Sequence, residues 1–276
     1  MYKELSNIPL SVRLARMTSA CLVFAHAVAI GFASYVDAQQ PRLIKGVSSN
    51  ATQGFAVVEL FTSQGCSSCP SADENLSEIT KQASQKGDNI VTLSFHVDYW
   101  NNLGWRDPYS MAEATKRQRL YAGVHGSKQV YTPQMVVNGT TELLGSSRDK
   151  SKVAIAKAIK QRPRSKMELM TNIEGNTVKA EWKIDGLQPD DIVNLALVQD
   201  QVEDRVMSGE NSGRTLKHLN VVRDFKVISP AKEADSLSLT IPEGVEPQSF
   251  HVVAYVQSPV DAGIHAVARR EVLNQK

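Results

Sequence analysis

Residues 55–70 read FAVVELFTSQGCSSCP, and this stretch decides the predicted fold. Residues 55–61 are apolar and rich in strand formers, which is the pattern of a strand buried on both faces. Residues 71–85 then carry apolar side chains at helical spacing. Cys66 and Cys69 therefore stand at a strand-to-helix junction. At the start of a helix, unpaired backbone N–H groups and the helix dipole favour the thiolate form of a cysteine.

The composition excludes several classes of function. The chain has 276 residues, of which 42% are apolar and 22% are charged, as in a globular protein with a buried core. A net charge of +2 is too small to indicate nucleic acid or an acidic membrane surface as a partner. Motifs of nucleotide-binding loops, serine hydrolases and zinc proteases are missing from the sequence. We expect no cofactor, no resident metal and no bound nucleic acid.

The first 38 residues have the pattern of a signal peptide. A basic start precedes an apolar stretch at residues 20–36, and a small residue, Ala38, ends the segment. We predict export to the periplasm or out of the cell, with cleavage after Ala38; Ala33 marks a second candidate cleavage site. After cleavage we expect no stable membrane insertion. The alternative is an uncleaved anchor, because the stretch is close to spanning length.

Signal cleavage changes the cysteine count. The chain has three cysteines, and Cys21 lies in the segment predicted to be removed. The mature protein would keep Cys66 and Cys69 alone. A disulfide scaffold needs several bridges that close long loops. A single close pair in an exported protein therefore indicates reactivity.

The rest of the chain reads as two domains after a leader at residues 39–54. The first, residues 55–161, predicts a strand-helix-strand unit with a parallel strand pair. Its later parts are a strand at 90–97, an insertion at about 98–130, a helix from Asp107 to about Ala122, a hairpin around Asn138-Gly139 and a helix at 148–161. Residues 161–165 predict a linker. Residues 166–276 predict a separate all-β domain, a small sandwich of short alternating strands.

The order of these elements resembles the thioredoxin fold. Cys66 and Cys69 follow the first strand, and Thr132-Pro133 stands just before the hairpin. In thioredoxin-like proteins that proline is cis and faces the cysteine pair, and the residue before it offers backbone hydrogen bonds to substrate. The resemblance implies these roles for Pro133 and Thr132. The expected fold class is thus an α/β thioredoxin-like domain with a helical and aromatic insertion, followed by the small all-β domain.

Four motifs carry a closer resemblance. They are residues 59–70, residues 96–108, residues 130–135, and residues 208–211 with Arg214, His218 and residues 221–223. Together they resemble a family of secreted bacterial thioredoxin-like proteins of unknown function. The resemblance covers essentially the whole mature chain.

The cysteine pair predicts thiol–disulfide exchange with protein or peptide thiols and an unidentified redox partner. Cys66, exposed at the helix start, would attack, and the more buried Cys69 would resolve the mixed disulfide. One alternative is an inert disulfide. The other is a metal site, copper included, completed by His96 or His125. Either would make the protein a non-catalytic periplasmic module that binds a metal or a protein partner.

Three further residues are candidates beside the pair. Glu59 stands in an apolar strand, where burial would raise its pKa and let it exchange a proton with Cys69; the alternative is a partly exposed glutamate at a sheet edge. Trp100 and Trp105 would form an aromatic platform for a peptide substrate, or else pack the insertion onto the core. His218, in the β region, is interpreted as a structural polar contact unless the two domains face one another.

Overall fold

A computed structural model describes residues 53–127 and 129–272. The chain divides into two units, Met1–Lys45 and Gly46–Lys276, and every described residue belongs to the second. The predicted signal peptide, the cleavage site after Ala38 and most of the 39–54 leader lie outside the described residues. No helix within the described ranges has the length and apolar character needed to cross a membrane.

The first half of the described chain contains the predicted strand-helix-strand unit. Its elements are β1 (Ala56–Thr62), α2 (Pro70–Lys86), β2 (Ile90–His96), α3 (Ala112–Val124), β3 (Gln134–Val137), β4 (Thr141–Leu144) and α4 (Arg148–Ala158). Strands β1 and β2 are parallel, with Val57 opposite Val91. The prediction of a parallel βαβ unit is therefore confirmed.

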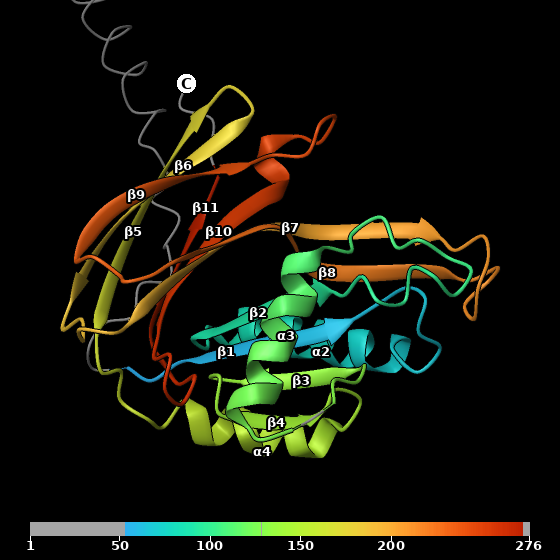
Figure 1. Ribbon diagram of the computed structural model, residues 1–276, viewed down its shortest axis with the longest axis horizontal. Helices are drawn as coiled ribbons and strands as arrows, with labels where there is room; N and C mark the ends of the chain where they lie inside the picture. The colour runs from blue at the N-terminus through green and yellow to red at the C-terminus, as the bar shows by residue number, and fades with distance from the viewer. Residues whose placement is uncertain (1–52, 128, 273–276) are drawn as a thin grey trace, which may run out of the picture. The chain divides into compact units, whose positions relative to one another are not determined.

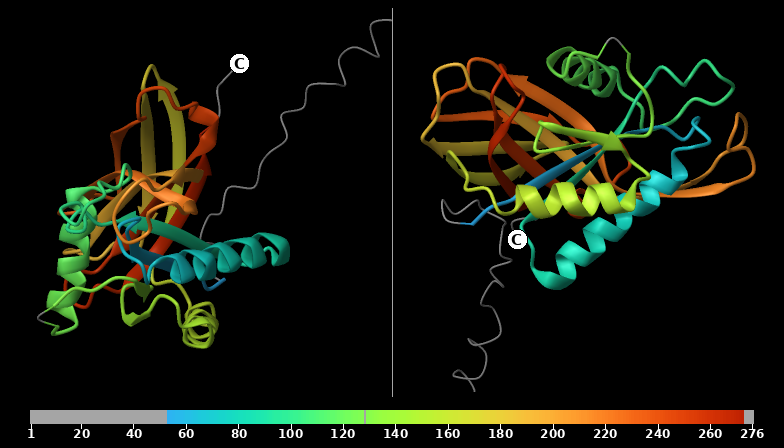
Figure 2. Two further views of the ribbon diagram at one scale, coloured as in Figure 1. Left: turned by 90° about the vertical axis from the view of Figure 1, so that its right-hand side faces the viewer. Right: turned by 90° about the horizontal axis from the view of Figure 1, so that it is seen from below.

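Strand β1 separates two apolar cores. Val57 and Phe61 belong to a core that includes residues of α3. Val58 and Leu60 belong to a second core, formed with α2 and α4. Accordingly, α3 lies on one face of the sheet, and α2 and α4 lie on the other (Figure 2). Because successive residues of a strand point to opposite faces, an all-apolar strand needs cover on both sides.

Strands β3 and β4 form the predicted hairpin around Asn138 and Gly139. The loop between the last paired residues, Val137 and Thr141, has three residues. Asn138 and Gly139 have positive φ, 47° and 74°, a backbone conformation that asparagine and glycine adopt with the least strain. A β carbon at Gly139 would lie 1.7 Å from the carbonyl oxygen of Ala262. The hairpin tip therefore presses against the distant segment around Ala262, and only glycine fits there.

Helix α3 begins later than the sequence indicates. We predicted a start at Asp107, but the helix starts at Ala112. The Asp107 carboxylate is used elsewhere: it accepts hydrogen bonds from the backbone N–H of Gln64 at 2.8 Å and of Tyr109 at 2.9 Å. Asp107 is thus a buried anchor of the loop and not a helix cap.

The second half forms strands and one short 3-10 helix. The elements are β5 (Lys166–Glu174), β6 (Thr177–Asp185), β7 (Ile192–Arg205), β8 (Thr215–Ile228), β9 (Ala234–Thr240), η1 (Pro247–Ser249), β10 (Phe250–Gln257) and β11 (Ile264–Glu271). Strands β5, β6 and β9 make a three-stranded antiparallel sheet. The other four join the first half in one eight-stranded sheet of order β11-β10-β7-β8-β2-β1-β3-β4 (Figure 1).

The expected fold class, a thioredoxin-like α/β domain followed by a separate all-β domain, is wrong. The described residues are mostly β, with three α-helices, and one mixed sheet runs through both halves. The physical reason lies in strands such as β10, whose eight residues are all buried. Val252 packs toward the three-stranded sheet, whereas Val253 and Tyr255 join the core around Phe61. A strand with two apolar faces binds the halves together.

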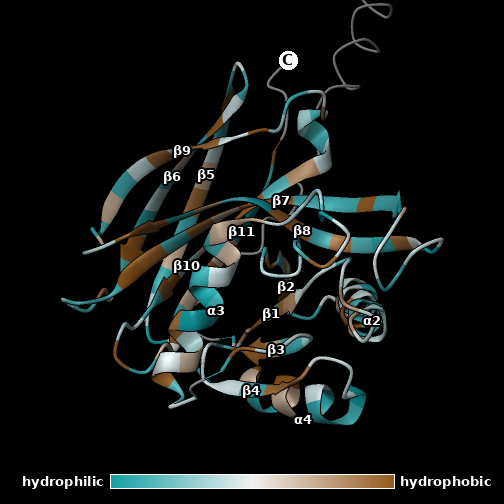
Figure 3. Cartoon of the chain, turned by 45° about the vertical axis from the view of Figure 1, so that its right-hand side comes forward, coloured by the Kyte–Doolittle hydropathy of each residue, from teal (hydrophilic) through white to brown (hydrophobic). Residues whose placement is uncertain are grey.

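Strands β7 and β8 are also longer than the sequence predicts. We expected strands at 192–199 and 220–228, but the hairpin extends to Arg205 and begins its return at Thr215. These distal ends are largely hydrophilic (Figure 3). They carry the tip of the hairpin toward the loop that follows β1 (Figure 1).

Candidate functional site

Cys66 and Cys69 form a disulfide at the junction of β1 and α2. Cys69 is the N-cap residue of α2, and its carbonyl oxygen accepts hydrogen bonds from the N–H groups of Ala72 and Asp73. Both cysteines are 0% exposed. The expectation that Cys66 is exposed at the helix start is therefore wrong. Of the motif, the intervening residues Ser67 and Ser68 reach solvent.

The tip of the β7–β8 hairpin, residues 206–214, covers the cysteine loop. Asn211, itself fully buried, donates hydrogen bonds of 2.9 Å to the carbonyl oxygens of Gln64 and Cys66. The Glu210 carboxylate accepts one of 2.9 Å from the Ser67 N–H. This contact with the Ser67 backbone and side chain lowers the pKa of Glu210. The tip thus binds the backbone of the cysteine loop directly.

Thr132 and Pro133 lie beside this loop. The Thr132–Pro133 peptide bond is cis, as the resemblance implied. A β carbon at Gly145 would meet both the Ala72 side chain of α2 and Pro133, at 3.0 and 3.3 Å, so the proline packs near the start of that helix. The Trp100 indole N–H donates to the Thr132 hydroxyl at 2.8 Å.

Both predicted aromatic residues contact the segment before Cys66. A β carbon at Gly65 would lie 3.2 Å from the Trp100 β carbon. The Trp105 indole N–H donates to the Gln64 side chain at 3.0 Å. Both tryptophans are partly buried. Trp100 and Trp105 therefore join the insertion to the cysteine loop, and their role in binding substrate stays a prediction.

Glu59 is fully buried, but the structure does not bring it to the cysteines. It points to the α3 face of the sheet, whereas α2 lies on the other face. Its carboxylate pairs with Arg117 at 2.7 and 3.0 Å and accepts hydrogen bonds from the hydroxyls of Tyr121 and Tyr255. Glu59 thus belongs to a buried ion pair that joins β1, α3 and β10.

A different set of ionisable side chains lies at the α2 face, near the cysteines. His96 Nδ1 is 2.7 Å from Asp107 Oδ2. The rings of His96 and His218 meet edge to face, with centroids 4.6 Å apart. His218 Nδ1 lies 3.5 Å from Asp73 Oδ1. All four side chains are at most 5% exposed. We call Asp73, His96, Asp107 and His218 the buried polar cluster.

Charge compensation shapes the cluster. Burial by itself would raise the pKa of Asp107, but the nearby His96 and hydrogen bonds from His96, Gln64 and Tyr109 outweigh it and lower the pKa to about 2. Burial would lower the pKa of His218, yet the carboxylates of Asp73, Asp107 and Asp204 raise it overall. The cluster therefore favours ionised Asp107 and protonated His218.

Sequence reasoning missed most of this site. Asp73 was assigned no role, Asn211 was named only within the motif at residues 208–211, and His218 was interpreted as structural because its strand was assigned to another domain. The available signal was the motif at residues 208–211 with His218, which the family resemblance grouped with the cysteines. The structure places that motif directly over the cysteine loop.

The predicted metal alternatives find no preformed ligand set at the cysteines. His125 bonds to Glu142 and to the carbonyl oxygen of Gly139 in the β3–β4 hairpin. Within residues 53–127 and 129–272, the one group of metal-ligating atoms that all lie within 4.8 Å of one another is Asp200, His251 and Glu271. That group is on β7, β10 and β11, beside the Arg269 guanidinium, which is 2.9 Å from Glu271.

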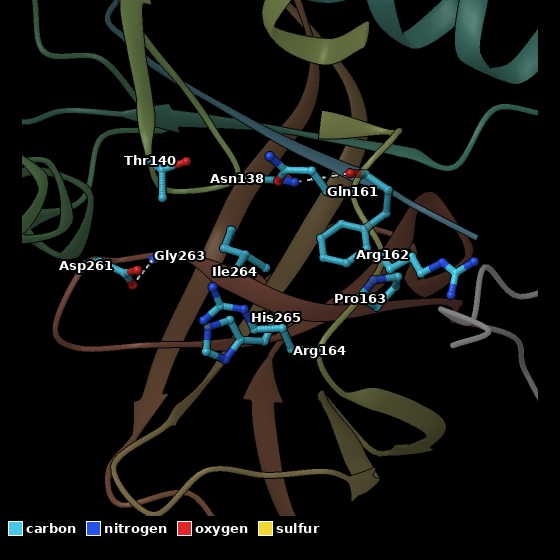
Figure 4. A pocket seen from close by; sticks show the side chains of 11 residues that line it. Asn138, Thr140, Gln161, Arg162, Pro163, Arg164, Asp261, Gly263, Ile264 and His265 are labelled. Atoms are coloured by element: carbon cyan, nitrogen blue, oxygen red, sulfur yellow. Dashed lines mark hydrogen bonds between the residues drawn. The ribbon is translucent and has the colours of Figure 1, made fainter. Parts of the chain in front are cut away.

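A cavity of about 100 Å³ lies at the opposite end of β1 (Figure 4). The segment predicted as a linker lines it with Arg162 and Arg164, together with Asn138 and His265. The Asn138 side chain is already hydrogen-bonded: it accepts from the Val57 N–H and donates to the carbonyl oxygen of Phe55, which precedes β1. The cavity is therefore a packing feature of the strand ends and is separate from the cysteines.

Comparisons with known proteins show what the chain is similar to. A crystal structure of a protein from Agrobacterium tumefaciens is 26% identical, covers 80% of this chain and 96% of its own, and has a TM-score of 0.57. HBP35 of Porphyromonas gingivalis has the same TM-score at 12% identity, covers 80% and 76%, and shows a similar fold alone. No curated protein matches. A family model described as "Protein of unknown function (DUF1223)" matches residues 57–257. The chain therefore belongs to the DUF1223 family.

Proposed function

We propose that this protein is exported and carries out thiol–disulfide exchange through Cys66 and Cys69 on protein or peptide thiols. The observation that carries the proposal is a disulfide at the start of α2, the helix that packs near the cis Thr132–Pro133 bond and bears Asp73 of the buried polar cluster. Burial of ionisable groups costs stability unless the groups are paired and hydrogen-bonded, and groups with perturbed pKa values gather at functional sites.

The geometry supports a division of labour between the cysteines. Cys66 Sγ lies 3.3 Å from the Ser68 hydroxyl, which can donate a hydrogen bond to a Cys66 thiolate. In the reduced state, the Cys66 thiolate attacks a substrate disulfide and forms a mixed disulfide with one substrate sulfur, while the substrate sulfur–sulfur bond breaks and the other sulfur leaves as a thiolate. Cys69 then attacks Cys66, which releases the substrate as a thiol and restores the pair. Thr132 and Pro133 flank the bound substrate segment in this proposal.

Burial of the pair requires the hairpin tip to open. A substrate sulfur must approach along the Cys66–Cys69 bond, and both sulfurs belong to residues that are 0% exposed. The contacts of Asn211 and Glu210 hold the tip closed. In this proposal, opening of the tip thus precedes exchange.

A trapping experiment tests the proposal. Reduced Cys69→Ser protein is mixed with a synthetic peptide that contains one disulfide, and the product is analysed by intact mass. We expect a mixed disulfide on Cys66, because the resolving thiol is absent. The matched variant Cys66→Ser should capture far less peptide. Equal capture by both variants would contradict the assignment, and capture by neither would contradict exchange itself.

The burial of both cysteines specifically favours one alternative, a non-catalytic binding module with a structural disulfide. The rate at which dithiothreitol reduces the disulfide in low concentrations of urea distinguishes this binding module from the proposed exchange protein. If the tip opens locally, the reduction rate depends weakly on urea; if reduction needs global unfolding, the rate rises steeply, with the slope of the unfolding transition. The steep result would support the module.

A further inference from the structure

The first turn of α2 places a carboxylate beside the resolving cysteine. Asp73 follows Cys69 by four residues, so the two side chains project from the same face of the helix, with β carbons about 5–6 Å apart. Both residues are buried on the side that faces the sheet. The face of α2 that bears Cys69 therefore also bears Asp73.

Several buried polar atoms of Asp73 and its neighbours lack a hydrogen-bond partner within the described residues. Both oxygens of Asp73, both ring nitrogens of His218 and Nε2 of His96 are buried and make no hydrogen bond within the described chain. The Asp73–His218 contact, at 3.5 Å, is an ion pair without hydrogen-bond geometry. Buried polar atoms are nearly always hydrogen-bonded, so several unbonded ones in one place indicate a site that exchanges protons or binds a polar group.

The surroundings of His218 are mainly acidic. Asp73 approaches it from α2, His96 from β2, Asp107 and Tyr109 from the insertion, and Asp204 from β7. Arg223 stacks on Tyr109 and is the nearby permanent cation. These carboxylates raise the pKa of His218 and so favour its imidazolium form, beside the Asp73 carboxylate.

We propose that His218 and Asp73 form the proton-transfer pair of the Cys66–Cys69 site. The inference rests on the proposed exchange function. When a substrate thiolate attacks Cys66, a sulfur–sulfur bond forms to the substrate, the Cys66–Cys69 bond breaks, and its electron pair goes to Cys69. A proton then passes from the His218 imidazolium, by way of the Asp73 carboxylate, to the Cys69 sulfur. The products are a mixed disulfide, a neutral Cys69 thiol and a neutral imidazole.

Cys69 needs this proton because a buried thiolate has a high free-energy cost. Cys69 leaves as an anion inside the protein, where a charge without a partner is strongly disfavoured. Transfer of a proton from His218 replaces an imidazolium and a thiolate by two neutral groups. Reversal of the transfer returns the nucleophilic thiolate when Cys69 resolves the mixed disulfide. The same pair thus serves both directions of exchange.

The pH dependence of reduction tests the pair. The rate of reduction by dithiothreitol is measured at constant dithiothreitol thiolate concentration. We expect the wild-type rate to fall as pH rises through the pKa of His218, by about a hundredfold, the low end of general acid catalysis. His218→Gln and Asp73→Asn should lack this fall and start from the lower rate.

A matched control is His265→Gln. His265 is also buried and lies 3.3 Å from an aspartate, Asp191, but it is remote from the cysteines. It should keep the wild-type pH profile. A fall in the rate of His218→Gln equal to that of the wild type would overturn the inference.

A second measurement needs no variant. The His218 imidazole is titrated by NMR in the oxidised and the reduced protein. A different pKa of His218 in the two redox states is expected, and identical titrations would overturn the inference. A disulfide that is reduced only by global unfolding would overturn the proposed function as well, whereas ready reduction with a flat pH profile would overturn the proton-transfer pair alone.

Discussion

Asn211 donates a hydrogen bond to the carbonyl oxygen of Cys66, across a sequence separation of 145 residues. This contact joins the hairpin tip of the second half to the cysteine loop of the first. It fixes the backbone of the cysteine loop. In the proposed exchange reaction, access to the cysteines therefore depends on a segment that is distant in sequence.

We expect Asn211→Ala to accelerate reduction of the disulfide. The change removes two hydrogen bonds that hold the tip closed. The Cys66 carbonyl oxygen keeps the hydrogen bond of 3.2 Å that it accepts from the Cys69 N–H. At about 1 kcal/mol for each bond, tip opening becomes easier by about 2 kcal/mol, or roughly 30-fold in rate. The measurement is the dithiothreitol reduction rate. Ser212→Ala, at an exposed position of the same tip, should keep the wild-type rate; equal rates in all three proteins would mean that the tip does not limit access.

The ionisation of Asp107 should make the free energy of unfolding depend on pH in the acid range. Its pKa is about 2 in the folded protein and 3.8 otherwise, so its contribution is present above pH 3.8 and is lost as pH falls toward 2. The shift corresponds to about 2 kcal/mol. Urea unfolding at pH 7 should show this loss for Asp107→Asn, and the difference from the wild type should shrink toward pH 2. Asp149→Asn, exposed on α4, is the control; a pH-independent deficit for Asp107→Asn would contradict the ionic origin.

Alanine substitutions at two hairpin glycines should distinguish the cost of backbone strain from the cost of a steric clash. Gly139 and Gly175 both have positive φ, but only at Gly139 would a β carbon collide, at 1.7 Å from the Ala262 carbonyl oxygen. Gly175→Ala should cost about 1–2 kcal/mol, the strain of a left-handed residue. Gly139→Ala should cost clearly more, because the β10–β11 connection must move. Urea unfolding measures both, and equal losses would show that the hairpin tip is not tightly packed.

The Glu59–Arg117 pair should be expensive to break. Arg117→Met leaves a buried carboxylate without its cation, which typically costs 3–5 kcal/mol. The double variant Glu59→Gln/Arg117→Met should recover part of that loss, because no buried charge remains. Arg148→Met breaks a surface pair with Glu78 and should cost less than about 1 kcal/mol. Thermal unfolding ranks the stabilities of the three variants. A double variant less stable than Arg117→Met would contradict this prediction.

Local features of this fold were predictable, because they depend on neighbouring residues. The apolar run before Cys66 gave a buried strand, and Asn138-Gly139 gave a hairpin turn. The cis bond before Pro133 followed from a resemblance and not from spacing. Each of these features is decided within about ten residues of sequence.

The remainder depends on contacts between distant segments. Strands 250–257 and 264–271 show apolar residues on both faces, but a sequence does not say what covers the second face. That uncertainty led to the two-domain prediction. For the site, Asp107 resembled a helix cap, and the closeness of His218 to Asp73 depends on β8 pairing with β2 at Ser94 and Val221. The buried polar cluster could not be assembled without that pairing.

The shared core under α3 has a consequence for how the chain is made. That core draws on residues from Phe55 to Val267, so β10 and β11 must be synthesised before Phe61 and Phe95 gain all their neighbours. A nascent chain that stops before β10 exposes this apolar surface and is prone to aggregate. Strands β10 and β11 therefore complete this core, and we expect the described fold to form only after β11 has left the ribosome.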